Sequence, residues 1–307
     1  MEYFLLIIGF VLLIKGADFF VDGCISVANK FHIPPMVIGL TIVAMGTSAP
    51  EAAVSIAASI QKAAGIAVGN IIGSNVFNLL VVIGICLFFI KMDVSRITLI
   101  RDYPFYIFSL VLLLVFSVGG VLGRFEGIVL LLFMTFYMFI LVRNAKQNKA
   151  SAAEDNYVSL SNVKTVLYIV IGAAAIVVGG EAVVNGAKEI ALSFGLTEQF
   201  IGLSIVAVGT SLPELVTSLV AVKKNECDIA VGNIIGSNIF NTLFIIGMAS
   251  VISPVAVSAE AFYDIIICIC GSLAVYGLCL HKKRLTMWKG NCMLLMYAVF
   301  FVYILTR

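Results

Sequence analysis

"GLTIVAMGTSAPEAAVS", residues 39–55, lies inside a long apolar run, yet six consecutive positions hold a glycine, two hydroxyls, a proline and a carboxylate. Proline removes a backbone hydrogen bond from a helix. An ionisable group at the centre of a bilayer costs at least about 2.5–3.5 kcal/mol. The same pattern returns as "GLSIVAVGTSLPELVTS", residues 202–218, which lies 163 positions later. A costly motif that occurs twice predicts a functional site inside a membrane.

The composition places the chain in a membrane. Of its 307 residues, 62% are hydrophobic and only 12% are charged, whereas a soluble chain carries roughly 25% charged residues. The net charge of +2 does not suggest a nucleic-acid partner. The seven cysteines lie mostly in apolar runs without a CxxC pair, which is typical of buried free thiols. Glu2 stands where a signal peptide would be basic, so the first apolar segment is expected to be a retained span.

A membrane helix needs about 20 apolar residues. Ten such segments are predicted, at 3–28, 34–60, 66–90, 103–120, 124–142, 165–191, 199–222, 228–252, 261–280 and 286–305. The polar stretch 143–164 is the predicted linker between a first unit, 1–142, and a second, 165–307. With both termini outside, 14 of the 19 Lys and Arg fall in inner loops. The positive-inside rule therefore predicts a cytoplasmic linker in a cell membrane.

The two halves repeat each other. "IAVGNIIGSNVFNLLVVIG" at 66–84 matches "IAVGNIIGSNIFNTLFIIG" at 229–247, again 163 positions on, and the register holds without a gap back to Gly16 and Gly179. Five helices per half is an odd number, so the second copy enters the membrane from the opposite side. The predicted fold is an all-α membrane protein of two inverted five-helix repeats, as in many secondary transporters.

The motifs supply oxygen ligands and no nitrogen or sulfur ligands. Pro50 and Pro213 free the carbonyls of Gly46 and Gly209, and the glycines are expected to allow local unwinding. In the third segment of each half, Ser74 shares a helix face with Asn78, and the same spacing recurs in the second half. An oxygen-only site favours hard cations such as Ca²⁺. The remaining motif amides, Asn70, Asn75, Asn233 and Asn238, are predicted to hold helices together by hydrogen bonds.

"GTSAPE…GNIIGSNVFN" and "GTSLPE…GNIIGSNIFN" resemble the paired α-repeats of the cation/Ca²⁺ exchanger superfamily, in its Na⁺/Ca²⁺ exchanger branch of prokaryotic type. The resemblance implies that Glu51 and Glu214 bridge Ca²⁺, helped by the backbone carbonyls of Thr47 and Thr210. It also implies flanking Na⁺ sites and a central layer, formed by Ser48, Ser211, Ser74 and Ser237, the carbonyls of Ala44 and Ala207, and the amides Asn78 and Asn241. No resident cofactor is expected, because Ca²⁺ and Na⁺ are the transported ions.

One position departs from the family. Several members, including K⁺-dependent ones, carry Asp where this chain has Asn241. The implied site charge is therefore −2, which argues against K⁺ co-transport. The short linker also leaves no room for the large regulatory domain of animal exchangers.

Three alternatives remain open on the sequence. H⁺ rather than Na⁺ could drive Ca²⁺ exchange through the same glutamates, and two acidic pore residues are compatible with a cation channel. An intramembrane enzyme is disfavoured, since the sequence offers no nucleophile–base pair. For the acids of the first segment, an ion pair between Lys15 and Asp18 is predicted in preference to an ion-access vestibule with Asp22. The lipid bilayer is the expected surrounding, and the oligomeric state is not predicted.

Overall fold

The computed structural model describes residues 2–61, 65–147, 160–194 and 207–306. The chain divides into two compact units, one made of residues 1–50 and 140–233 and the other of residues 51–139 and 234–307. Each unit takes segments from both halves of the sequence. The predicted repeat boundaries are therefore not the boundaries of compact packing, and they stay a prediction.

Unit 1 (residues 1–50 and 140–233) is helical throughout its described residues. Its elements are α1 (Glu2–Phe31), α2 (Pro35–Ile38), the π-helical η1 (Gly39–Val43), α3 (Ala44–Thr47), α9 (Asn162–Ser193), α11 (Ala207–Gly209), α12 (Leu212–Lys223) and the first half of α13 (Cys227–Ile239). At about 1.5 Å per residue, the 30 residues of α1 and the 32 of α9 exceed a hydrocarbon layer of about 30 Å. Helices of this length fit the layer when they tilt or when their ends reach beyond it.

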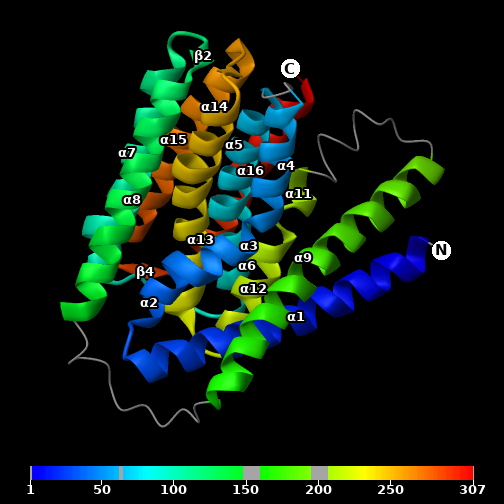
Figure 1. The fold of residues 1–307 in the computed structure, drawn as a ribbon, viewed down its shortest axis with the longest axis vertical. Helices are drawn as coiled ribbons and strands as arrows, with labels where there is room; N and C mark the ends of the chain where they lie inside the picture. Colours follow the sequence, from blue (N-terminus) through cyan, green and yellow to red (C-terminus); the bar gives the residue numbers. More distant parts are fainter. Residues whose placement is uncertain (1, 62–64, 148–159, 195–206, 307) are drawn as a thin grey trace. The chain divides into compact units, whose positions relative to one another are not determined.

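The pair α1 and α9 lies side by side and antiparallel (Figure 1), since Gly9 faces Gly179 and Gly16 faces Gly172. A methyl group on any of these four glycines would lie 2.6–2.9 Å from backbone atoms of the facing helix. The glycines therefore permit the close backbone approach that holds membrane helices together. Gly9 and Gly172 are 163 positions apart, as are Gly16 and Gly179, so the contact repeats the internal symmetry of the sequence.

Unit 2 (residues 51–139 and 234–307) holds most of the remaining helices and two short strand pairs. Its elements are α4 (Ala49–Ile60, which starts in unit 1), α5 (Gly65–Phe77), η2 (Asn78–Val82), α6 (Ile83–Phe89), β1 (Met92–Asp93), η3 (Thr98–Asp102), α7 (Tyr103–Ser117), β2 (Val121–Leu122), α8 (Arg124–Gln147, which ends in unit 1), the end of α13, η6 (Phe240–Ile245), α14 (Ile246–Ile252), β3 (Val255–Ala256), α15 (Ala259–Leu280), β4 (Arg284–Leu285) and α16 (Met287–Thr306). The segments η2, η3 and η6 are π-helical.

The two ladders of unit 2 each join one half of the sequence to the other. In the antiparallel pair β1–β4, Met92 lies opposite Leu285, and in β2–β3, Leu122 lies opposite Val255. Met92 and Val255 are 163 positions apart, as are Leu122 and Leu285. Each ladder is therefore the symmetry counterpart of the other.

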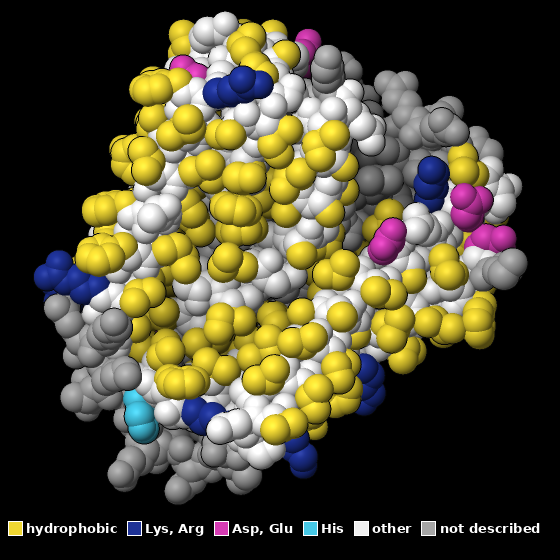
Figure 2. Space-filling view, in the orientation of Figure 1, with side chains coloured by type: hydrophobic (Ala, Val, Ile, Leu, Met, Phe, Trp, Pro, Cys, Tyr) yellow, Lys and Arg dark blue, Asp and Glu magenta, His cyan; other side chains and the backbone are white. Residues whose placement is uncertain are grey.

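The chain is a multi-pass membrane protein. Over the described ranges, eight helices are long and apolar enough to cross a membrane, and Pro35–Thr47 with Ala49–Ile60 forms a bent ninth. Figure 2 shows apolar side chains over much of the visible face, with few charged ones among them. Part of the predicted seventh segment, 199–222, lies outside the described residues, so the count of ten stays a prediction.

The ends of the predicted linker, 143–164, are helical, and its bounds stay a prediction. Helix α8 continues to Gln147 and α9 begins at Asn162, so helix extends into the 143–164 stretch from both ends. Residues 148–159 lie outside the described part of the chain.

Lys289, at the start of α16, binds to the end of α15 in unit 2. Only 1% of the residue is exposed, and its ammonium group donates at 2.7 Å to the carbonyls of Leu278, His281 and Arg284. These carbonyls lie at and just beyond the C-terminal end of α15, where helix acceptors lack intrahelical donors. A cation at this end also complements the helix dipole.

Replacing Lys289 by Met should destabilise the protein, because the carbonyls of Leu278, His281 and Arg284 lose a charged donor. We expect a loss of about 2–4 kcal/mol, seen as a lower midpoint of thermal unfolding in detergent. Lys282→Met is the control, since Lys282 is exposed. Equal midpoints for the two variants would contradict the capping role.

Candidate cation site

Both GTSxPE motifs interrupt a helix at the serine. Ser48 separates α3 from α4 with φ −83° and ψ 11°, and Ser211 precedes α12 with φ −93° and ψ 5°. A ψ near zero lies in the sparsely populated bridge region, where many active-site residues are found. The chain bends by 50° at the first break. The predicted interruption is therefore confirmed at both motifs.

The motif glycines act differently from the prediction. Gly46 lies inside α3 and Gly209 ends α11, so neither residue is unwound. A methyl group on Gly46 would lie 2.7 Å from the ring of Phe20, and one on Gly209 would overlap Val184. The expectation of glycine-driven unwinding was wrong, because these glycines make room for side chains of α1 and α9.

In unit 1, the carboxylate of Glu214 is fully buried beside a hydroxyl from the other half of the sequence. Ser48 Oγ donates to Glu214 Oε1 at 2.8 Å. The carbonyl of Ala44 accepts from Ser48 N at 3.0 Å and from Thr47 Oγ1 at 3.3 Å. Residues of both motifs are thus in direct contact within this unit.

Three further predicted ligands of unit 1 lie at or near the second break. Thr210 and Ser211 are buried, and in the described structure the Thr210 hydroxyl is buried without a hydrogen-bond partner. Ala207 is the first residue of α11. A buried oxygen without a hydrogen-bond partner is costly unless another ligand satisfies it.

Asn233 is the hydrogen-bonding centre of unit 1. Its Oδ1 accepts from Thr47 Oγ1 at 3.0 Å, and its Nδ2 donates to Ser218 Oγ at 3.0 Å and to the carbonyl of Glu214 at 3.5 Å. Its counterpart Asn70 in unit 2 donates to Ser55 at 3.2 Å. The predicted role of these amides as contacts between helices is confirmed.

In unit 2, the carboxylate of Glu51 is also fully buried. Ser74 Oγ donates to Glu51 Oε1 at 3.4 Å, a long bond. Ser237 is buried in α13. Asn78 and Asn241 stand at the starts of the π-helical segments η2 and η6, and such segments are frequent at functional sites.

The side-chain oxygens of Asn78 and Asn241 set them apart from the other amides. Each is buried, and over the described ranges each has no hydrogen-bond partner. Each unit thus holds a fully buried motif glutamate together with neutral oxygens. In the described residues no three His, Cys, Asp or Glu side chains form a metal cluster, so a cation here would depend on the hydroxyl, amide and carbonyl oxygens as well.

The acids of α1 pair with a different lysine from the one predicted. Lys224, just after α12, contacts Asp18 at 2.8 Å and also contacts Asp22. The expected pair between Lys15 and Asp18 is replaced by this contact, because the fold of unit 1 brings Lys224 to α1. Partial burial lowers the pKa of Lys224, but the bonds and charges of the two aspartates outweigh it, so the pKa is raised.

The sequence reasoning missed Asp102 as a membrane acid. This buried carboxylate of unit 2 accepts from Arg101 at 2.7 and 3.1 Å and from Tyr137 at 3.1 Å. The adjacent Arg–Asp pair in an apolar run is the signal that could have found it. Its charge is compensated locally, and it belongs to no repeat motif.

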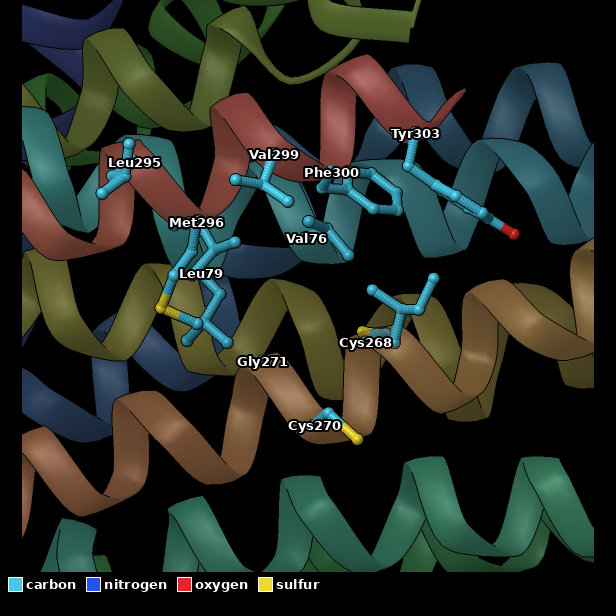
Figure 3. A pocket seen from close by; sticks show the side chains of 12 residues that line it. Val76, Leu79, Cys268, Cys270, Gly271, Leu295, Met296, Val299, Phe300 and Tyr303 are labelled. Carbon is cyan, nitrogen blue, oxygen red and sulfur yellow. The ribbon is translucent and has the colours of Figure 1, made fainter. Parts of the chain in front are cut away.

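A cavity of about 570 Å³ in unit 2 has no ion-binding chemistry. Figure 3 shows it between α5, α15 and α16, lined by apolar and sulfur-containing side chains such as Leu79, Met296 and Cys270, with the Tyr303 hydroxyl at one end. None of the predicted site residues lines it.

Comparison with known proteins assigns the family. Residues 1–143 and 164–306 match the family described as sodium/calcium exchanger protein. The chain belongs to the sodium/calcium exchanger family. It is 38% identical to the putative antiporter CaxA of Alkalimonas amylolytica, with 97% of each chain covered. It is 32% identical to the sodium/calcium exchanger MaX1 of Methanosarcina acetivorans, over 98% of this chain and 97% of the relative.

The fold agrees with the sequence match. The sodium-calcium exchanger NCX_Mj, soaked with 2.5 mM Na⁺ and 0.1 mM Ca²⁺, superposes with a TM-score of 0.85 at 31% identity, covering 97% of this chain and 96% of that one. The family resemblance seen in the motifs is therefore confirmed. This exchanger-family protein is a cation/Ca²⁺ antiporter, a transporter rather than an enzyme. The individual site residues stay predictions.

The hydrogen bonds of Asn233 predict unequal effects at two equivalent positions. Asn233→Leu removes the hydrogen bonds to Thr47, Ser218 and the Glu214 carbonyl and should cost about 2–4 kcal/mol, whereas Asn70→Leu removes one side-chain bond and should cost about 1 kcal/mol. Thermal unfolding of the two variants in detergent measures the difference. An Asn70→Leu variant as unstable as Asn233→Leu would argue against the central role of Asn233.

Proposed function

We propose that this exchanger moves Na⁺ and Ca²⁺ in opposite directions by alternating access at a site to which both repeats contribute. The observation that carries the proposal is the pair of interrupted helices, each with one fully buried glutamate beside neutral oxygens. Helices broken in this way present ion ligands in many secondary transporters.

Charge balance explains why two glutamates are needed. We propose that Glu51 and Glu214 together neutralise one Ca²⁺, with Thr47, Thr210, Asn78 and Asn241 as further ligands. Flanking Na⁺ ligands are Ser48, Ser211, Ser74, Ser237 and the carbonyls of Ala44 and Ala207. Both cations need the same two carboxylates, so either Ca²⁺ or a set of Na⁺ binds at one time. Carboxylates that lack a cation are costly in the low-dielectric interior. The protein is therefore expected to change between its inward-open and outward-open forms only when ions are bound.

The symmetric contacts within each unit support the inverted-repeat architecture. Helices α1 and α9, which are counterparts 163 positions apart, pack antiparallel, and the two ladders of unit 2 are counterparts of each other. We propose that both termini lie outside and the central linker inside, as the Lys and Arg distribution indicates.

Proton-driven exchange is the second candidate. In this mechanism the carboxylates of Glu51 and Glu214, both fully buried, carry the protons that exchange for Ca²⁺. The relative CaxA is named only as a putative antiporter, which leaves its driving ion unstated.

Neutralising either glutamate should abolish exchange. For Glu51→Gln and Glu214→Gln we expect Ca²⁺ uptake into Na⁺-loaded proteoliposomes to fall by at least about tenfold, because one charge is lost from a site that must balance a divalent ion. Asp93→Asn is the control, since Asp93 is exposed and lies in a short ladder. Normal uptake by either glutamine variant would sink the proposed site.

Applying a Na⁺ gradient and a pH gradient separately distinguishes the two candidate driving ions. With an outward Na⁺ gradient and no pH gradient we expect Ca²⁺ uptake, and with a pH gradient in Na⁺-free medium we expect none. If more than two Na⁺ replace each Ca²⁺, uptake also responds to voltage, by about 2.3 kcal/mol per charge per 100 mV. Uptake driven by the pH gradient alone would favour the proton mechanism.

A further inference from the structure

Four asparagines and one threonine of unit 2 form a closed hydrogen-bond arrangement around the two amide ligands. All five residues are fully buried: Asn75, Asn78, Asn238, Asn241 and Thr242. An amide can present either its oxygen or its nitrogen to a neighbour, and only the oxygen attracts a cation. The neighbours of Asn78 and Asn241 therefore decide whether these residues can be cation ligands.

The orientation of the Asn78 amide is set by the backbone carbonyl of Asn75, through the amide of Asn238. Asn238 Nδ2 donates to the carbonyl of Asn75 at 3.2 Å, and since a carbonyl only accepts, the nitrogen of Asn238 must be on that side. The oxygen of Asn238 then faces Asn78 and accepts from its Nδ2 at 3.3 Å. The nitrogen of Asn78 is thereby engaged, and its oxygen is the atom that has no hydrogen-bond partner within the described residues.

The orientation of the Asn241 amide is set by the backbone carbonyl of Asn238, through Asn75 and the hydroxyl of Thr242. Thr242 Oγ1 donates its only proton to the carbonyl of Asn238 at 2.8 Å, so towards Asn75 it can only accept. Asn75 must offer its nitrogen there, at 2.9 Å. The oxygen of Asn75 then accepts from Asn241 Nδ2 at 3.2 Å, which leaves the oxygen of Asn241 without a partner in the described part of the chain.

The two chains of hydrogen bonds are symmetry counterparts with one difference. Asn75 and Asn238 are 163 positions apart, and so are Asn78 and Asn241, but the counterpart of Thr242 is Leu79. The first chain therefore reaches its carbonyl directly, whereas the second depends on a hydroxyl.

We propose that Asn75, Asn238 and Thr242 are positioning residues that fix the amide oxygens of Asn78 and Asn241 toward the transported cation. The inference rests on the proposed function, because it assumes that these two oxygens bind Ca²⁺. The Thr242 hydroxyl determines which end of each amide donates in the hydrogen-bond series that leads to Asn241. Without its hydroxyl, Asn75 is free to reverse and to turn the nitrogen of Asn241 toward the ion.

Thr242→Val tests the proposal with a change of one hydroxyl for one methyl. In proteoliposomes we expect the Ca²⁺ concentration for half-maximal uptake to rise about three- to tenfold, the effect of one orienting hydrogen bond, with an unchanged maximal rate. Thr242→Ser should restore the wild-type value, because serine keeps the hydroxyl. Ser117→Ala is the control: Ser117 is buried in the same unit and bonds to the carbonyl four residues earlier, as Thr242 does, but it touches none of the asparagines.

Thermal unfolding of the purified full chain separates positioning from stability. For Thr242→Val we expect a smaller upward shift of the midpoint on adding Ca²⁺ than for wild type, since the shift follows affinity. A variant that unfolds earlier without ions, yet keeps the wild-type Ca²⁺ shift and half-saturation, would show a purely structural role and overturn the proposal. Wild-type protein with neither Ca²⁺ uptake nor a Ca²⁺ shift would instead overturn the proposed function, and this inference with it.

Discussion

A fully buried glutamate in each unit, Glu214 in unit 1 and Glu51 in unit 2, limits how the groups around it can be arranged. A charge removed from water is expensive unless hydrogen bonds and opposite charge compensate it. Glu214 receives the Ser48 hydroxyl at 2.8 Å and Glu51 receives that of Ser74 at 3.4 Å. Hydroxyls alone leave the negative charge in place, which supports the proposal that a cation binds at these carboxylates. Another buried acid, Asp102, is paired with the guanidinium of Arg101, which compensates its charge locally.

The polar groups around the carboxylates divide into those that bind helices together and those that remain available. Asn233 uses both ends of its amide on Thr47, Ser218 and the backbone. Asn78 and Asn241 use only their nitrogens. This division follows from donor and acceptor chemistry, since a fixed backbone carbonyl at the end of each hydrogen-bond chain leaves one arrangement for every amide. Amides whose oxygens are held toward a cation attract it without adding negative charge, which suits a site that must also release the ion.

Contacts between symmetry-related residues join the two halves of the sequence within each unit. In unit 1, α1 and α9 meet through glycines of both halves, and in unit 2 the two ladders also pair one half with the other. Neither half of the sequence forms a unit by itself. Because counterparts from the two halves pack together, each unit contains motif residues of both halves. These are, for example, Ser48 and Glu214 in unit 1 and Ser74 and Ser237 in unit 2.

The sequence by itself determined the membrane location, the 163-residue repeat, the family and the two helix breaks, because composition, periodicity and the Gly-Thr-Ser-x-Pro-Glu pattern depend only on local chemistry. Tertiary structure alone decided which lysine meets Asp18 and Asp22, why Gly46 and Gly209 must be glycines, that Lys289 caps α15, and which way each amide points. These features depend on residues distant in sequence, such as Lys224 against Asp18 and Asn75 against Thr242. A single sequence carries no signal for such pairings, because many arrangements satisfy the same local rules and only the packed fold selects one.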